Sequence, residues 1–261
     1  MKNNAIQLEE IRLTGINKLD DYDWYHERHR VFPAVFENRM HKNILDISAG
    51  MGIVGKRIND NYSANLICND ISPTCLRSLK KLGLNTVSFD LDVADKAFPF
   101  PDEHFDAIIS LATIEHLIHI DHFLNEIHRI MKNKGYLYLS APNYNGLLYL
   151  IPLLITGKTF HDPLDVKECY EFYAHFRYFT YQTLLDYVSS IGFIPDSVYL
   201  PIPENSSNYK KLKAKSKVKA LIFRTIMKSV YYLLSPRWAS EPIICFQKNE
   251  AVKSKFRKVI L

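Results

Sequence analysis

Glycines and carboxylates early in the chain have the spacing of a nucleotide-binding turn. Residues 43–55 read Asn-Ile-Leu-Asp-Ile-Ser-Ala-Gly-Met-Gly-Ile-Val-Gly, an apolar run that leads into Gly50 and Gly52. Glycine permits positive φ and lets a ligand approach the backbone, and the helix expected after the turn points free N–H groups toward it. Asp70 ends the next apolar run about 20 residues further on, where a carboxylate can accept hydrogen bonds from ribose hydroxyls. The pattern predicts a strand, a turn and a helix that bind a nucleotide-like ligand.

Two classes of cofactor fit this pattern. The glycines of residues 50–55 match G-x-G-x-x-G, and enzymes of NAD and of S-adenosylmethionine (SAM) both place glycines after the first strand and a carboxylate after the second. Tyr209 and Lys213 have the Tyr-x-x-x-Lys letters of a short-chain dehydrogenase, but they lie within a run of lysines and lack that family's glycine pattern. An NAD-dependent dehydrogenase stays open as an alternative.

Two later blocks, Phe98 to Leu117 and Glu126 to Asn143, favour SAM. With them the chain resembles the class I SAM-dependent methyltransferases over residues 40–195. It is most similar to the small-molecule group with type 11 or type 23 domains, which includes ubiquinone-biosynthesis O-methyltransferases. The usual motifs of that group are D-x-G-C-G-x-G, L-P-F-x-x-x-x-F-D, E-H, R-x-L-K-x-G-G and P-N. Here Ser48-Ala49 replaces Gly-Cys, Ala97-Phe98 replaces the apolar pair before Pro-Phe, and Lys134-Gly135 replaces Gly-Gly.

The resemblance implies an α/β fold: a doubly wound, Rossmann-like, seven-stranded and mostly parallel sheet with helices on both faces and an antiparallel last strand. It implies SAM as cofactor, with the amino-acid end near Asp46, Ser48, Ala49, Gly50 and Gly52. The ribose is expected at Asp70 and Ile71, the adenine at Asp90 and Leu91 with Asp92 as alternate, and the methionine and methyl at Ser110 and Leu111. Turn chemistry or helix capping is the competing interpretation of these acids.

The chemistry expected beside the cofactor is transfer of a methyl group to a hydroxyl, which usually needs a base. His116, in the Glu115-His116 pair, is the first candidate, and His175 and His161 are second; alternatively, Glu115 and His116 only brace the crevice wall. Some relatives hold a divalent metal with E-x-x-E-H, but Ala112 occupies the first carboxylate position, so no metal is predicted. The replaced Gly-Cys also leaves open a catalytically degenerate fold used as a binding partner.

Periodicity and turn residues predict the elements that position these groups. Apolar runs predict strands at 44–48, 65–70, 86–92, 106–110, 135–140, 194–200 and 241–248. Helices are predicted at 53–60, 73–82, 121–132 and 181–191, with a further helical segment at 21–40. Ser72 and Thr180 are the expected N-caps of two of them. The carboxyl ends of parallel strands line the ligand crevice, so the acidic residues should converge there.

The chain of 261 residues is expected to form one decorated domain. Residues 1–204 would be the SAM-binding domain, with an apolar, aromatic-rich lid insertion at 144–178. Residues 205–238 would be a basic amphipathic helical insertion, 239–250 the final strand and 251–261 a basic tail. The lid favours a small, lipid-linked or sugar-linked acceptor that is partly apolar.

Charged residues are distributed unevenly along the chain. Residues 1–204 carry 19 Lys and Arg against 26 Asp and Glu, whereas residues 205–261 carry 14 against 2. Residues 209–234 also carry an apolar stripe at helical spacing, Val218, Ile222, Ile226, Val230 and Leu233. We interpret this segment as a surface helix that meets an anionic membrane, or alternatively as a helix packed on the sheet with a solvated basic face. Nucleic acid is disfavoured because no recognised binding module accompanies the charge.

The remaining composition is ordinary. No apolar run approaches the roughly 20 residues of a membrane span, and the first ten residues lack the apolar core of a signal peptide. The expected location is cytoplasmic, with peripheral contact at the inner membrane surface. Four cysteines without C-x-x-C spacing are expected to be buried free thiols.

Overall fold

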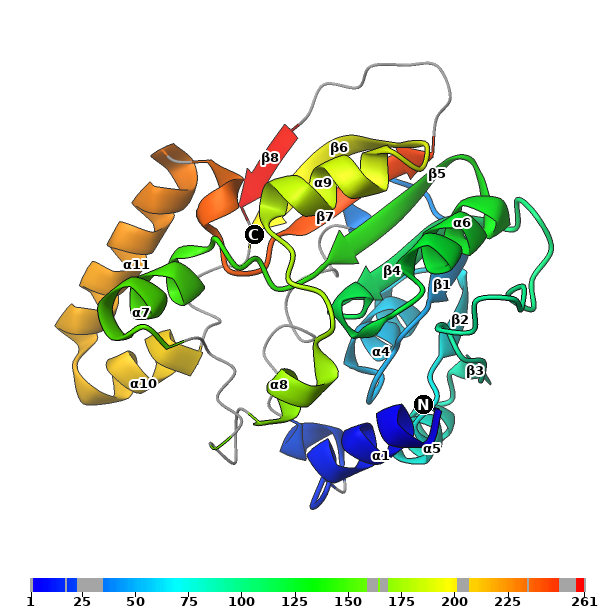
Figure 1. Cartoon of the computed structure of the whole chain (residues 1–261), viewed down its shortest axis with the longest axis horizontal. Coiled ribbons are helices and arrows are strands. Elements are labelled where there is room, and N and C mark those ends of the chain that lie inside the picture. Colours follow the sequence, from blue (N-terminus) through cyan, green and yellow to red (C-terminus); the bar gives the residue numbers. More distant parts are fainter. Residues whose placement is uncertain are drawn as a thin grey trace.

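The centre of the fold is a twisted sheet of eight strands (Figure 1). The computed structural model describes residues 2–16, 18–22, 35–158, 164, 169–200, 207–233, 235–248 and 257–260. In these residues the strands are β1 (Asn43–Asp46), β2 (Asn65–Asn69), β3 (Asn85–Val87), β4 (Phe105–Leu111), β5 (Met131–Ser140), β6 (Phe193–Leu200), β7 (Ile243–Lys248) and β8 (Arg257–Ile260).

The strand order is β3-β2-β1-β4-β5-β7-β6-β8. Strands β1 to β5 pair parallel with their neighbours, and β7 lies antiparallel between β5 and β6. The seven-stranded, mostly parallel sheet expected from the sequence is therefore confirmed, including its antiparallel strand. The eighth strand lies in the tail at 251–261, for which no strand was predicted, and pairs parallel with β6 at the sheet edge.

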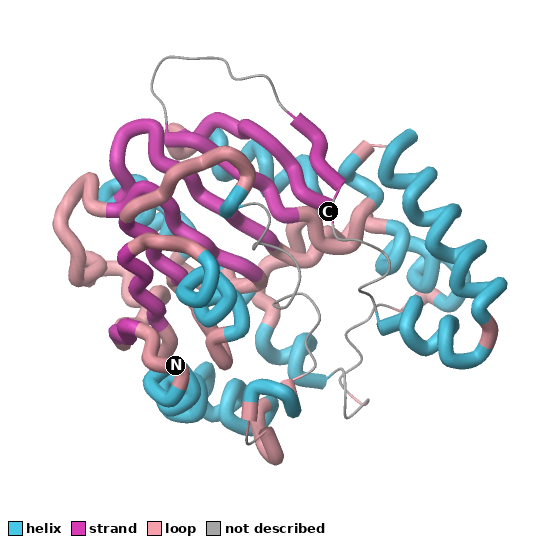
Figure 2. The backbone as a smooth tube through the Cα atoms, turned by 180° about the vertical axis from the view of Figure 1, so that it is seen from behind, coloured by secondary structure: helices cyan, strands magenta, loops and turns pink. Residues whose placement is uncertain are grey.

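Helices cover both faces of the sheet, as the view from behind in Figure 2 also shows. They include α4 (Ile53–Asn61), α5 (Pro73–Lys81), α6 (Ile120–Ile130) and α9 (Tyr181–Ser189). Because successive strand residues point to opposite faces, Ile108 of β4 joins the core under α6 and α9, and Ile109 joins the core under α4 and α5. The two apolar clusters on opposite faces make the fold doubly wound.

Helix starts follow the capping residues that the sequence offers. The Ser72 hydroxyl accepts the N–H of Cys75 at 3.1 Å, and Pro73 is the first residue of α5. Thr180 accepts the N–H of Thr183 at 3.2 Å and forms a capping box at the start of α9. Both predicted N-caps are thus confirmed.

The arginine of the second motif block holds the scaffold together. The Arg129 guanidinium donates to the carbonyl oxygens of Phe98 (3.1 Å) and Phe100 (2.9 Å) and to the carboxylates of Glu126 and Asp102. It ties the loop before β4 to the last turn of α6. These residues lie in blocks that resemble methyltransferase motifs, and their contacts are structural.

The remaining helices decorate the sheet. They are α1 (Lys2–Arg12), α7 (Leu147–Thr156), α8 (Cys169–Ala174), α10 (Ser207–Lys215) and α11 (Lys217–Leu233), with short 3₁₀ turns η1 (Leu19–Asp21), η2 (Ile114–His116) and η4 (Pro236–Trp238). The sequence predicts one helix over 209–234, but the structure has two. Ser216 separates them, because its hydroxyl accepts the N–H of Lys219 at 3.3 Å and begins α11. None of the described helices is long and apolar enough to cross a membrane.

Some predictions fall outside the described residues. Most of the helical segment at 21–40 lies there, as do residues 159–163, which include His161, and 165–168 of the lid at 144–178. The described parts of the lid are α7, α8 and the segment that leads from α8 into α9.

Candidate functional site

The glycine turn lies where predicted, between β1 and α4. Gly50 and Gly52 both have positive φ, 55° and 90°, which glycine adopts without the strain of a side chain. The turn is fastened to β2 by a hydrogen bond from the Ala49 N–H to the Asn69 carbonyl (2.9 Å). A Cβ on Gly52 would lie 2.7 Å from the Leu79 side chain. Gly52 therefore serves helix packing as well as the turn.

Two carboxyl groups, one buried and one half-buried, face this turn. Asp46, at the end of β1, is 4% exposed, and its Oδ2 has no hydrogen-bond partner among the described residues. Asp70 follows β2 and accepts the N–H groups of Gly50 (2.9 Å) and Ser72 (2.8 Å). Burial raises the pKa of Asp46 to about 7, with a further contribution from Asp70, and burial likewise raises the pKa of Asp70 to about 7.

These groups fit the two ends of SAM. A buried carboxylate oxygen without a partner suits the ammonium group of the methionine part, because a charge-assisted hydrogen bond would satisfy it. The N–H groups that Asp70 accepts hold its carboxylate beside the turn, where ribose hydroxyls could replace or join them. The roles of Asp46 and Asp70 in SAM binding stay predictions.

A buried asparagine, which the sequence interpretation did not select, holds the segment where adenine is expected. Asn69 is fully buried, and its Nδ2 donates to the carbonyl oxygens of Ile47 (2.9 Å) and Phe89 (3.3 Å). Its Oδ1 accepts the Phe89 N–H at 2.9 Å. This side chain joins the ends of β1 and β2 to the segment that carries Asp90. In the sequence, the position of Asn69 directly before Asp70 could have indicated this role.

Hydrogen bonds distinguish the two candidate acids after β3. Asp92 Oδ1 accepts the N–H groups of Ile118 (2.9 Å) and His119 (2.7 Å) at the start of α6. Asp90 Oδ1 accepts the Asp92 N–H at 3.0 Å, a local turn. Asp92 therefore has the helix-capping role named as its alternative, which leaves Asp90 and Leu91 as the better candidates for the adenine.

The end of β4 forms the wall nearest the expected methyl group. Ser110 is fully buried and its Oγ has no partner within the described residues. The Ser48 and Thr113 hydroxyls share a hydrogen bond, which links the glycine turn to the residues after β4. Ala112 has φ 48°, unusual for a residue with a side chain, and strain of this kind often marks functional sites.

The predicted catalytic histidines meet beyond this wall. The Glu115 carbonyl accepts the N–H groups of Phe176 (2.8 Å) and Arg177 (3.2 Å), which binds η2 to the segment before α9. As a result the rings of His116 and His175 lie 4.7 Å apart between centroids. The structure thus brings together two of the three proposed histidines from positions 59 residues apart in the sequence.

The protonation state of His116 follows from its hydrogen-bond partner and its surroundings. Its Nδ1 lies 3.0 Å from the Ala174 carbonyl, which can only accept, so Nδ1 carries the proton and Nε2 has the lone pair. Burial lowers the pKa of His116, so the ring is neutral near pH 7. The His175 Nδ1 lies 3.1 Å from the Tyr144 hydroxyl.

Glu115, His116 and His175 also form a possible cation site. One ligand atom from each lies within 4.8 Å of the other two, and Glu115 is 1% exposed. The prediction of no metal was based on Ala112 within the local motif. His175 comes from a different segment and supplies a third ligand group that the local motif does not contain.

Helix α1 lies beside the start of α5 and beside α8, a placement that the sequence interpretation did not predict. Glu10 accepts hydrogen bonds from the Ser72 and Thr74 hydroxyls and so fastens α1 to the start of α5. The Tyr170 hydroxyl of α8 donates to Glu9 at 3.2 Å, and Figure 1 shows α1 and α8 side by side below the strand ends. Residues of this helix lacked any motif.

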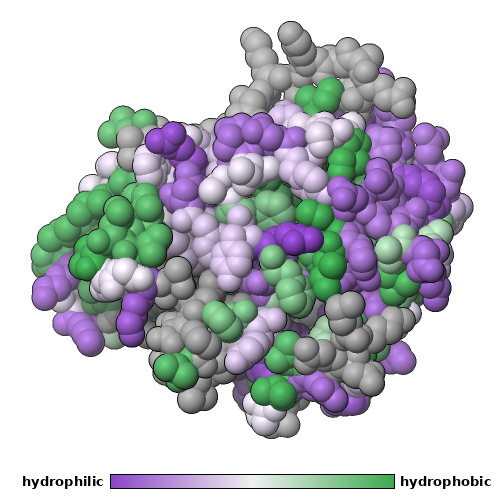
Figure 3. Space-filling view, in the orientation of Figure 1, coloured by the Kyte–Doolittle hydropathy of each residue, from purple (hydrophilic) through white to green (hydrophobic). Residues whose placement is uncertain are grey.

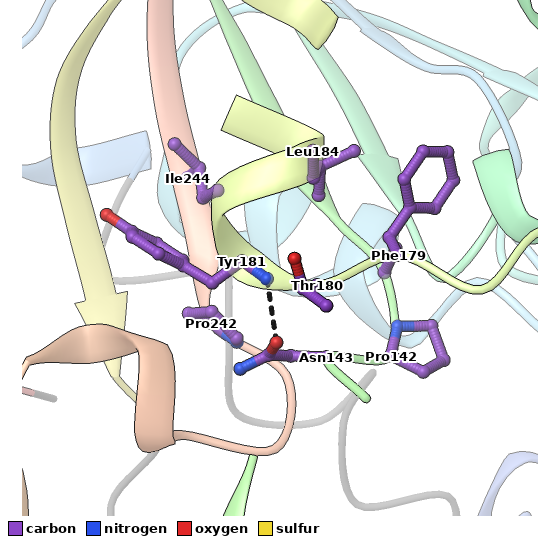
Figure 4. A pocket seen from close by; sticks show the side chains of 9 residues that line it. Pro142, Asn143, Phe179, Thr180, Tyr181, Leu184, Pro242 and Ile244 are labelled. Atoms are coloured by element: carbon purple, nitrogen blue, oxygen red, sulfur yellow. Dashed lines mark hydrogen bonds between the residues drawn. The ribbon is translucent and has the colours of Figure 1, made fainter. Parts of the chain in front are cut away.

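A shallow hollow elsewhere in the structure is not a candidate functional site. It lies between β5, β7 and the start of α9, where the Tyr181 N–H donates to Asn143 Oδ1 at 2.7 Å (Figure 4). Asn143 also donates to the carbonyl oxygens of Arg237 (2.7 Å) and Ala239 (2.6 Å). The Pro-Asn block is thus a structural junction, and the hollow leaves no space for a water molecule.

The sheet order and the glycine turn define the fold of the class I SAM-dependent methyltransferases. Residues 45–139 match the family model described as a methyltransferase domain, so the chain contains a SAM-dependent methyltransferase domain. The antiparallel strand β7 also distinguishes this sheet from the all-parallel dinucleotide-binding arrangement of the NAD alternative.

Known proteins resemble parts or the whole of the chain. An uncharacterised protein of Methanocaldococcus jannaschii is 32% identical over 133 residues, 51% of this chain and 55% of that protein. The mitochondrial arginine hydroxylase NDUFAF5 of Rattus norvegicus is 27% identical over 92 residues, 35% of this chain and 26% of that protein. The chain therefore spans about half or less of these curated relatives.

A solved structure extends the likeness to nearly the whole fold. A SAM-dependent methyltransferase of Thermotoga maritima, described as a possible histamine N-methyltransferase, superposes with a TM-score of 0.59. The two share 16% identity over 94% of this chain and all of that one. At this identity the likeness establishes the fold and leaves the acceptor open.

Proposed function

We propose that this protein transfers the methyl group of SAM to a hydroxyl of a small, lipid-linked or sugar-linked acceptor. The observation that supports a hydroxyl is the state of His116: a half-buried, neutral imidazole whose Nδ1–H is fixed on the Ala174 carbonyl and whose Nε2 has the lone pair. Amines and carbanions that are already nucleophilic do not require such a base, whereas a hydroxyl does.

The chain's own residues would bind and align the reactants. When bound, SAM supplies a methyl group made electrophilic by its sulfonium. Asp46 would pair with the ammonium group and Asp70 would accept the ribose hydroxyls, while Ser110 lines the side where the methyl must lie. In this arrangement the acceptor oxygen forms a bond to the methyl carbon, the bond from that carbon to sulfur breaks, and the hydroxyl proton passes to His116 Nε2. Alignment of acceptor and methyl supplies much of the rate.

Aromatic groups near the histidines support a partly apolar acceptor. The Tyr144 ring lies 4.8 Å from that of Tyr178 and 5.1 Å from that of Tyr149 in α7, between centroids. The Tyr170 ring lies 6.2 Å from His116. An acceptor that reaches His116 would therefore pass aromatic surface.

A second mechanism for the same transfer uses a divalent cation. Glu115, His116 and His175 converge within 4.8 Å, and a carboxylate with two imidazoles suits zinc, manganese or iron. A cation there would lower the pKa of a bound hydroxyl and replace the general base. The two mechanisms share His116 but assign different roles to His175.

The first test is titration calorimetry with SAM, S-adenosylhomocysteine and NAD. We expect both adenosyl ligands to bind and NAD not to bind; binding of NAD alone would overturn the proposal. Transfer of labelled methyl from SAM is then measured against a panel of hydroxyl compounds with apolar, lipid or sugar groups. If no compound in the panel is methylated while an amine is, the hydroxyl assignment is wrong.

Two variants and a chelator separate the mechanisms. With His116 as base, His116→Ala should lower kcat by about a hundredfold to ten-thousandfold with unchanged SAM affinity, and His175→Ala should have a smaller effect. With a cation, both variants should lose activity alike and a chelator should abolish it. His119→Ala, an exposed histidine nearby, is the control. A fully active His116→Ala would remove both mechanisms.

A further inference from the structure

One end of the molecule exposes an unusual amount of apolar surface. Helix α7 has no charged residue and no buried residue, and Leu154 and Ile155 are 74% and 77% exposed. Its large exposed side chains are Leu148, Ile151, Leu153, Leu154 and Ile155. Figure 3 shows this hydrophobic surface at the side of the molecule where Figure 1 places α7, α10 and α11. Such a patch usually marks an interaction site.

Helix α11 adds a second apolar row. The stripe at 218–233 was expected from the sequence either to pack on the sheet or to meet a membrane. The structure shows Met227 and Val230 packed on the core and Ala220 buried, whereas the other apolar residues of the stripe are exposed. The exposed members of α11 are Val218, Leu221, Ile222, Ile226 and Leu233. We call these exposed residues of α7 and α11 the apolar platform.

The two helices are attached to the same junction. A Cβ on Gly146, the N-cap of α7, would lie 2.7 Å from the Ala239 carbonyl, so α7 begins directly against the segment after η4. Helix α11 leads into η4 and packs against it. The junction between Gly146 and residues 236–240 therefore fixes where both helices leave the sheet.

The charge around the apolar platform indicates which kind of partner it would bind. Residues 205–240 contain nine Lys and Arg and no Asp or Glu. Lys213 and Lys215 of α10 and Lys217 and Lys219 of α11 are exposed. Two copies of this surface would repel each other, which disfavours a dimer through it. An apolar face bordered by lysines is the pattern of helices that lie in the interface of an anionic bilayer.

We propose that α7, α10 and α11 dock the protein on anionic membranes, with the apolar platform in the interfacial region and the lysines on lipid headgroups. The docking surface connects to the histidine site through aromatic contacts. Tyr149 of α7 contacts the Tyr144 ring, and the Tyr144 hydroxyl lies 3.1 Å from His175. If the proposed function holds, the acceptor would enter from the lipid surface along this path; the docking itself does not depend on that function.

Vesicle co-sedimentation of the full chain tests the docking. Phosphatidylcholine vesicles are compared with vesicles that also contain phosphatidylglycerol. We expect binding to the mixed vesicles, weakened by salt, and little binding to phosphatidylcholine alone. Each basic residue near an anionic surface is worth about a fivefold change in partition coefficient. Lys217→Glu with Lys219→Glu should therefore reduce binding by more than about twentyfold.

Matched variants distinguish the surface from general charge and hydrophobicity. Lys80→Glu with Lys81→Glu changes the same charge on exposed residues of α5, and should leave binding intact. Leu154→Glu should reduce binding about tenfold, whereas Met40→Glu, at a position 91% exposed, should not. Light scattering reports the oligomeric state of each variant.

Three outcomes would overturn the docking proposal. They are equal binding to both vesicles, equal losses in the control variants, and a dimer in solution that Leu154→Glu dissociates. SAM affinity of the platform variants should stay unchanged, and His116→Ala should bind vesicles normally. Failure of methyl transfer and failure of docking are therefore measured separately.

Discussion

Asp46→Asn should remove the part of the pH dependence of stability that comes from Asp46. In the ligand-free protein, burial raises the pKa of Asp46 from 3.8 to about 7. The folded state then holds this proton more tightly than the unfolded chain. Its contribution to stability is fully present below pH 4 and is lost as the pH rises through about 7.

The size of the loss follows from the shift in pKa. A rise from 3.8 to about 7 corresponds to about 4 kcal/mol of unfolding free energy, lost between pH 4 and pH 8. Asp70 contributes to the pKa of Asp46, so the loss belongs in part to the pair. Asparagine keeps the shape and cannot ionise, so the variant should gain stability relative to the wild type as the pH rises.

Urea unfolding of the ligand-free protein at a series of pH values measures this difference. The control is Asp95→Asn, the same change at an exposed position. SAM adds a second readout: its ammonium group favours ionised Asp46, so its affinity should rise more steeply from pH 6 to pH 8 in the wild type than in the variant, which retains Asp70. If the curves of wild type and Asp46→Asn stay parallel between pH 4 and 8, Asp46 is not held in a desolvated site and the reasoning fails.

Two further substitutions test the scaffold of the site. Gly52→Ala should lower the unfolding free energy by about 2 kcal/mol or more, since the residue has φ 90° and a Cβ would lie 2.7 Å from Leu79; an unchanged value in urea unfolding would show that the turn relaxes without cost. Asn69→Ala removes three hydrogen bonds to Ile47 and Phe89 and should cost about 2 to 4 kcal/mol, together with weaker SAM binding in calorimetry. A loss of stability with normal SAM affinity would confine Asn69 to a structural role.

Local patterns were sufficient to predict the glycine turn and the two carboxyl groups that face it. The turn, Asp46 and Asp70 lie within or directly after short apolar runs, and a parallel strand buried on both faces is recognisable from composition alone. The choice between Asp90 and Asp92 was not recognisable, because it depends on N–H groups of Ile118 and His119 that approach from another element.

Long-range packing decided the features that sequence reasoning missed. The position of α1 depends on Glu10 meeting Ser72 and Thr74, about sixty residues away. Periodicity identified the stripe of α11 but not its orientation, since an apolar stripe looks the same whether it faces a sheet or solvent. The strand β8 is four residues long and exists by pairing with β6, for which the tail sequence offers no signal.

The proposed acceptor side is built differently from the glycine turn, and this explains why the sequence does not identify the acceptor. His116 comes from the end of β4, Tyr144 from the end of β5 and His175 from the segment before α9. They meet because the Glu115 carbonyl pairs with the N–H groups of Phe176 and Arg177. Each segment can vary without disturbing the glycine turn, so the same cofactor site can serve different acceptors. In this chain the segment after Tyr144 continues into an uncharged exposed helix, which under the two proposals would join acceptor choice to the docking surface.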